Sequence, residues 1–135
     1  MNTRDPATSL AGPAYDVPCG VGGIAFVKQS NTIVGACPNA LVLVNVSSGA
    51  VRTQTAFLPG RPEAIVYLYG DVVAIALSGP RGGVVLVDLS GTVVGVVAKD
   101  SCRPYGLAGT AGLALLNYDT LLVADCAEMS IAFYS

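Results

Sequence analysis

The chain has 135 residues, enough for one domain, and it is markedly apolar: 53% of its residues are hydrophobic and only 12% are charged. Its net charge of −2, with basic residues scattered singly, excludes the positive footprint of a nucleic-acid-binding protein. Histidine is absent, which excludes Ser-His and Cys-His catalysis and histidine metal sites. No apolar run is long enough for a membrane-spanning helix, so we predict no membrane span, and no motif predicts a cofactor.

Residues 1–17 form a leader that has two open interpretations. The residues around Ala7–Pro13 precede the first repeat at the offset where a fourth strand closing the last repeat would lie. The stretch Ala7–Gly12 contains poor strand formers, and the alternative is therefore a disordered leader.

Residues 18–60 form the first of three repeats, which opens with Pro18-Cys19-Gly20-Val21. Short runs rich in Val, Ile and Leu alternate with turn residues, and Ser48-Gly49 is a hairpin signal. The pattern predicts four strands, at Val21–Val27, Thr32–Ala36, Leu41–Val46 and Val51–Phe57.

The same order returns in residues 61–101 and 102–135, with restarts spaced by about 40 residues. These restarts read Pro62-Glu63-Ala64-Ile65 and Pro104-Tyr105-Gly106-Leu107, and Ser90-Gly91 repeats the hairpin signal. The third repeat has no fourth run before Ser135. The predicted strands are Ile65–Tyr69, Val72–Leu77, Val84–Leu89 and Thr92–Ala98, then Leu107–Leu116, Leu121–Ala124 and Met129–Tyr134.

Four short antiparallel strands in about 40 residues are typical of a β-propeller blade. The runs Leu121–Asp125 and Ile131–Phe133, after a Pro-x-Gly-aliphatic opening at Pro104, resemble NHL-type and related six-bladed propeller repeats. This resemblance implies an all-β, propeller-like fold with three four-stranded antiparallel blades. A closed propeller needs at least about four blades. We therefore expect half of a ring or a fragment of a longer one, completed by a second copy placed head to tail or by other subunits.

The four cysteines form two similar pairs. Cys19 and Cys37 flank the first two strands of the first repeat, and Cys102 and Cys126 flank those of the third. In an antiparallel pair the start of one strand lies beside the end of the next, which brings each pair within disulfide range. The matched positions favour two disulfides over reduced, buried thiols, and disulfides would indicate an extracellular or other oxidising compartment.

The loops at one rim supply the candidate binding residues. Arg61 and Arg103 each precede a repeat's proline, so we expect them in equivalent loops of neighbouring blades, either as solvated or locally salt-bridged residues or as a rim that contacts a ligand or partner. The tyrosines and phenylalanines are expected mostly in the core, and tryptophan is absent, which disfavours a lectin. The other residues predicted to join this rim are Tyr105, Asn39, Arg81 and Glu128.

These observations favour a non-catalytic module that serves as a structural or protein-interaction subunit of an oligomer. The alternative is a propeller enzyme of the lactonase or esterase type, or a small-ligand binder, with its site at the channel mouth. Related propeller hydrolases hold a divalent cation with carboxylates and Asn near the channel. Asp125 lies at the strand end where such a ligand could stand, but no ligand set can be assembled around it.

Overall fold

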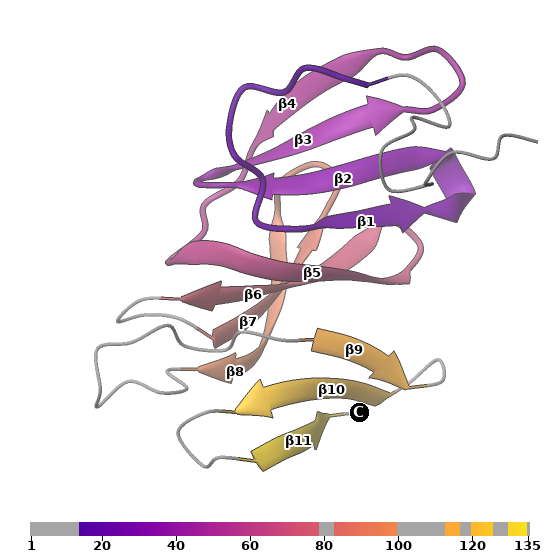
Figure 1. The fold of residues 1–135 in the computed structure, drawn as a ribbon. Helices are drawn as coiled ribbons and strands as arrows, with labels where there is room; N and C mark the ends of the chain where they lie inside the picture. Colours follow the sequence, from indigo (N-terminus) through magenta and orange to yellow (C-terminus); the bar gives the residue numbers. More distant parts are fainter. Residues whose placement is uncertain (1–13, 79–82, 100–112, 117–119, 126–129, 135) are drawn as a thin grey trace, which may run out of the picture.

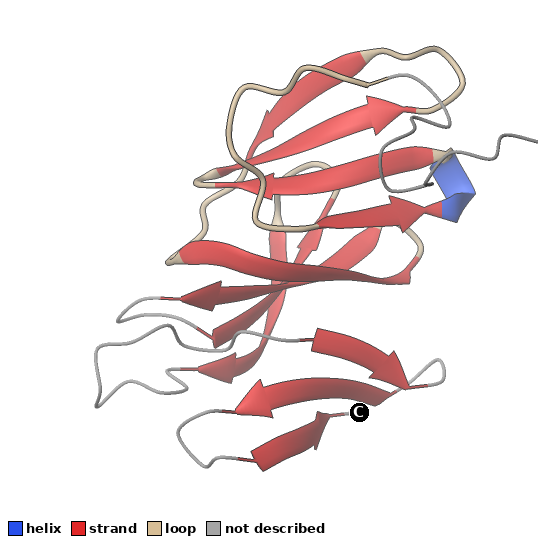
Figure 2. Cartoon of the chain, in the orientation of Figure 1, coloured by secondary structure: helices blue, strands red, loops and turns tan. Residues whose placement is uncertain are grey.

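The computed structural model describes residues 14–78, 83–99, 113–116, 120–125 and 130–134, and these form an all-β protein (Figures 1 and 2). The first sheet contains β1 (Ile24–Val27), β2 (Thr32–Cys37), β3 (Ala40–Asn45) and β4 (Val51–Thr55). The second contains β5 (Arg61–Tyr69), β6 (Val72–Ser78), β7 (Gly83–Asp88) and β8 (Val93–Lys99), and the third β9 (Leu113–Leu116), β10 (Thr120–Asp125) and β11 (Ser130–Tyr134). A single 3₁₀ turn, Lys28–Ser30, joins β1 to β2.

Each sheet is an antiparallel meander in which neighbouring strands follow one another in the sequence. This confirms the predicted all-β class and the predicted order of strands. The third sheet has three strands among the described residues. The described part of the leader, residues 14–17, forms no strand, and its earlier part lies outside the described residues.

The first two proline phrases do not occupy equivalent places, and the third lies outside the described residues. Strand β5 begins at Arg61, four residues before the predicted start, so Pro62 is a strand residue paired with Leu77. Pro18 instead lies in a bend that precedes β1. Proline is tolerated in β5 because this strand forms the edge of its sheet, where a missing N–H removes no ladder hydrogen bond. The prediction that Pro18 and Pro62 occupy equivalent positions in their repeats is therefore wrong.

The strand registers define the true equivalence between the first two sheets. Ile24 pairs with Gly35 and Phe26 pairs with Ile33, just as Ile65 pairs with Ile75 and Tyr67 pairs with Val73. Successive side chains of a strand point to opposite faces. Ile24 and Phe26 therefore share the face of the first sheet that corresponds to the Ile65 and Tyr67 face of the second.

The second sheet lies between the other two (Figure 1). Its Ile65 and Tyr67 face packs against the first sheet in a shared core, in which the largest fully buried side chains include Leu41, Leu43, Ile75 and Leu77. Its opposite face packs Ala74, Ala76 and Val84 against Leu121 and Leu113 of the third sheet. Full burial of each such Val, Leu or Ile side chain stabilises the fold by about 1.5–3 kcal/mol.

The first sheet also buries part of its outer face, which points away from the second sheet. Val42 and Val44 on β3 are only 1% and 5% exposed, because Tyr15 and Cys19 of the segment before β1 pack on them. We call residues 14–22 the N-terminal segment. This segment packs over β3 on the outer face and contributes no strand.

The hairpin turns follow the predicted chemistry. Gly49 and Gly91 both have positive φ values, 75° and 88°, which an L-residue adopts at a cost. The residues that end the preceding strands secure these turns: the Asn45 side-chain oxygen accepts from the Ser48 N–H at 2.9 Å, and the Asp88 carboxylate accepts from the Ser90 N–H at 3.0 Å. The predicted turns at Ser48-Gly49 and Ser90-Gly91 are confirmed.

Candidate functional site

A cleft opens between the first two sheets, at the rim where β2 ends and β5 begins. Its volume is about 340 Å³. The sequence places a glycine-rich stretch on one wall and the start of β5 on the other. The lining residues are Gly20, Val21, Gly22, Ala36, Pro38, Arg61, Pro62 and Glu63.

Arg61 is the one predicted rim residue that lines this cleft among the described residues. It was expected in a loop, but it is the first residue of β5 and pairs with Ser78. Its Nε lies 3.2 Å from Glu63 Oε1, and its side chain is 75% exposed. An ion pair this exposed contributes about 0–1 kcal/mol to stability. The guanidinium is therefore placed for contact with solvent or a ligand, and it does not support the core.

Glu63 is the site residue that the sequence reasoning missed. Its Oε1 accepts a hydrogen bond from the Ser78 hydroxyl at 2.8 Å as well as from Arg61. The Ser78 hydroxyl lies 3.4 Å from the Arg61 carbonyl oxygen, which makes it a link between neighbouring strands. The ladder shifts register between Pro62 and Ala64, and Glu63 lies at this irregularity. The only signal in the sequence was its place beside Arg61 and Pro62.

Asn39 serves the backbone of its own turn. Its φ of 56° is the left-handed conformation that Asn tolerates better than most residues. Its carbonyl oxygen accepts from the Ala56 N–H at 3.2 Å, and its side-chain oxygen accepts from the Leu58 N–H at 3.4 Å. Asn39 thus holds the connection from β4 to β5, and it follows the lining residue Pro38 without lining the cleft itself.

The remaining predicted rim residues, Arg81, Arg103, Tyr105 and Glu128, lie outside the described residues. Their gathering with Arg61 stays a prediction. The terminal nitrogens of Arg61 have no hydrogen-bond partner within the part of the chain that the structure describes. They leave the cleft able to donate to a carboxylate or another anionic group.

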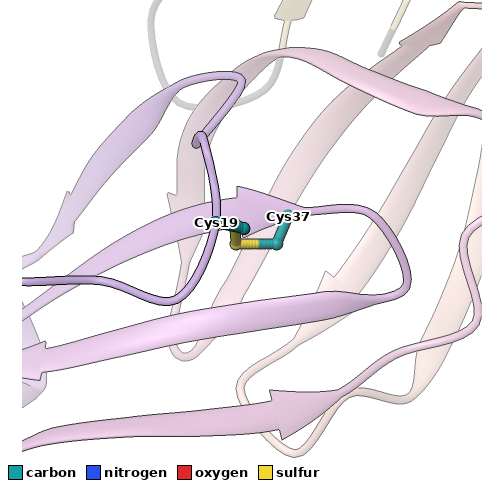
Figure 3. Close-up of a disulfide and its surroundings, with 2 residues drawn as sticks. All are labelled: Cys19 and Cys37. Carbon is teal, nitrogen blue, oxygen red and sulfur yellow. A yellow bond between two sulfur atoms is a disulfide. The ribbon is translucent and has the colours of Figure 1, made fainter.

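A disulfide joins Cys19 to Cys37 and confirms the first predicted pair (Figure 3). The two Cα atoms are 6.1 Å apart, and Cys37 is only 3% exposed at the end of β2. The bond fastens the N-terminal segment to the outer face of the first sheet. Such a bond fits an oxidising compartment. The second pair, Cys102 and Cys126, lies outside the described residues and stays a prediction that peptide mapping of unreduced protein can test.

The expectation that the aromatic residues are mostly core is wrong for three of them. Phe57 is 78% exposed in the connection between β4 and β5, Tyr69 is 58% exposed at the end of β5, and Phe26 is 48% exposed on β1. Phe57 and Tyr69 lie at element boundaries, where the strand pattern that predicted burial ends. Phe26 lies inside a strand, and its exposure has a different cause, since it faces away from the second sheet.

A second cleft, of about 450 Å³, lies at the opposite end of the same two sheets, between the turn after β1 and the turn after β5. Its lining includes Asp71, whose carboxyl is the only acidic group there. Within the described ranges, no group of three or more Cys, Asp and Glu side chains gathers to hold a metal ion. Asp125 is the last residue of β10, at the strand end where the sequence placed it.

The comparisons with known proteins do not assign the chain to a family. No family model matches the sequence, and no curated protein sequence matches it. Among the described residues, no helix has the length and apolar character needed to cross a membrane.

Proposed function

We propose that the chain is a segment of a β-propeller of the NHL-like type and acts without catalysis, as a structural or protein-interaction subunit of a larger assembly. One observation carries this proposal: three antiparallel meanders follow one another, and each new sheet packs its equivalent face against the sheet before it. Blades succeed one another in this way around a propeller axis. Their first strands, β1, β5 and β9, also lie in succession along the stack (Figure 1).

The number of described sheets, the composition and the cleft support a role in assembly. Among the described residues, three sheets are fewer than a closed ring requires. The low charged content, 12% of the residues, suits a chain that buries much of its surface. The exposed Arg61 and the cleft beside it provide a rim at which a partner's carboxylate could be held. An extracytoplasmic location agrees with the disulfide.

The solution mass tests this proposal. Light scattering at micromolar concentration should give a multiple of the chain mass of 13.6 kDa. The same preparation should show no hydrolysis of lactone or ester substrates when calcium is added. A folded, thermally stable monomer would contradict the proposal, and calcium-dependent turnover would favour the alternative of a propeller hydrolase.

A further inference from the structure

The outer face of β1 is open and apolar. Ile24 is 63% exposed and Phe26 is 48% exposed, although both lie inside a regular strand. Their neighbours Ala25 and Val27 point the other way and pack in the core shared with the second sheet. The N-terminal segment covers β3 on this side through Tyr15 and Cys19, so it bounds the open area without filling it. We call the area around Ile24 and Phe26 the leading face.

In the second sheet, the face equivalent to the leading face is covered by the first sheet. By strand register, Ile65 is equivalent to Ile24 and Tyr67 is equivalent to Phe26. The first two are the same residue and the second two are both aromatic. Both are partly buried against the core that joins the first two sheets. The third sheet repeats this arrangement, because Leu113 of β9 packs against the second sheet. The chain therefore builds the same type of contact twice.

The third sheet carries the other half of this contact, on the side that points away from the second sheet. Ala114 pairs with Leu122, and both follow residues that face the second sheet, Leu113 and Leu121. Alternation along a strand places Ala114 and Leu122 on the opposite side. Ala114 is exposed there and Leu122 is half-buried. We call this side the trailing face.

The preceding sheets use the equivalent positions for stacking. Ala25 pairs with Val34 in the first sheet, and Val66 pairs with Ala74 in the second. Each pair packs toward the sheet that follows it. Ala114 and Leu122 are thus a stacking pair with no following sheet among the described residues.

We infer that the leading face of one copy docks on the trailing face of a second copy, head to tail. This inference rests on the proposed function and names its partner. No other sheet covers either face in the part of the chain that the structure describes. The two faces are complementary halves of the contact that the chain makes internally, so a second copy offers the surface that each one fits. Pairing two leading faces with each other would leave both trailing faces open. A head-to-tail contact repeats the internal one, and it closes a ring when the rotation between sheets allows.

Photocrosslinking tests this contact directly. Benzoylphenylalanine in place of Phe26 keeps the aromatic ring, and a mixture of ¹⁴N- and ¹⁵N-labelled protein distinguishes links between copies from links within one. We expect mixed-isotope crosslinks from position 26 to the peptides that contain Leu113–Leu116 or Thr120–Asp125. Crosslinks between copies that reach the first sheet instead would overturn the inference in favour of a leading-face pair.

Charge substitutions provide the second measurement. Phe26→Asp and Ala114→Asp should each reduce the assembly to the mass of a single chain, because each places a carboxylate in the contact. Phe57→Asp is the matched control: this phenylalanine is 78% exposed but belongs to neither face, so the mass should not change. Circular dichroism checks that each variant is folded, and the crosslinks do not depend on the charged variants.

The results separate this inference from the proposed function. If the wild-type chain is a monomer, both fail. If it assembles but Phe26→Asp and Ala114→Asp leave the mass unchanged, or position 26 gives no crosslink between copies, only the head-to-tail contact fails.

Discussion

Strand β3 of the first sheet and strand β7 of the second are equivalent, but their side chains on the equivalent face are shielded from water by different parts of the chain. Val42 and Val44 on β3 occupy the same register positions as Val85 and Val87 on β7, and all four are at most 5% exposed. The second sheet buries its pair under a whole neighbouring sheet. The first buries its pair under a short segment that the Cys19–Cys37 bond holds in place. In the first sheet these valines are thus buried by a disulfide-linked segment, whereas in the second sheet the equivalent valines are buried by sheet stacking.

The largest effect is expected from a charge in the stacked half. Val87→Asp would place a carboxylate at a position with 0% exposure, between two sheets that cannot separate without losing their common core. The cost of burying an unpaired polar or charged group is at least several kcal/mol. We expect that the variant no longer unfolds cooperatively in urea. Circular dichroism measures this transition.

The matched variant for that test is Val44→Asp in the first sheet. Among the described residues, the N-terminal segment is what packs over this residue, and its Tyr15 can move away without breaking the Cys19–Cys37 bond, so the core between the first two sheets stays intact. The expected loss is about half as large, roughly 2–3 kcal/mol. Equal losses for the two variants would contradict the comparison.

Removal of the disulfide should have an effect of similar size to Val44→Asp. Replacing Cys19 and Cys37 together with alanine would free a loop closed over 18 residues, and chain entropy predicts a loss of about 3 kcal/mol. Hydrogen exchange should locate the loss in the first sheet, with amides of β2 and β3 losing protection. Equal loss of protection in β6 and β7 would show that the bond stabilises the whole stack and not the first sheet alone.

Asn39 offers a smaller test at the connection between the sheets. Asn39→Ala should destabilise the fold by about 1–2 kcal/mol, because alanine tolerates the left-handed conformation poorly and cannot accept from the Leu58 N–H. Asn39→Gly keeps the conformation and loses only the acceptor, so its cost should be smaller. Urea unfolding of both variants separates the two contributions. If both variants match the wild type, the turn does not depend on Asn39.

The smallest expected effect distinguishes the two hairpin turns by pH. The Ser90 hydroxyl donates to the Asp88 carboxylate and, with the amides of Thr92 and Ser90, lowers the pKa of Asp88 against a smaller opposing effect of burial. The lowered pKa means that this carboxylate stabilises the fold above about pH 4 and loses that contribution as the pH falls further. Solvent screening limits it to less than about 1 kcal/mol. Asn45, at the matching turn, has no such titration.

Asp88→Asn gives the second hairpin turn the same residue that the first turn has at Asn45. The variant should lack the part of the stability loss that the wild type shows as the pH falls below about 4. Thermal unfolding across this pH range measures the difference. Asn45→Asp is the reverse exchange and should add an acid-sensitive contribution to the first turn. An unchanged pH profile in both variants would contradict the role given to the Asp88 carboxylate.

Local chemistry allowed the strands and turns to be predicted, because alternating apolar runs and Ser-Gly hairpins determine them over a few residues. The Cys19–Cys37 bond could also be predicted, since antiparallel pairing brings strand ends together. The role of Asn39 could not, because the Leu58 N–H that donates to its side-chain oxygen comes from a different strand connection. The exposure of Phe26 could not be predicted either: Phe26 and Tyr67 have equivalent surroundings in the sequence, and only the presence of a preceding sheet distinguishes them.

The backbones of the first two sheets approach each other closely at two glycines. Near the first strands, a Cβ atom on Gly22 would lie 2.0 Å from the Pro62 carbonyl oxygen. Near the last strands, a Cβ atom on Gly91 would lie 2.0 Å from the Thr55 carbonyl oxygen. A side chain at either glycine would meet backbone of the neighbouring sheet that cannot move aside without separating the two sheets. The first two sheets can therefore pack this closely at both places only because these two positions lack a Cβ atom.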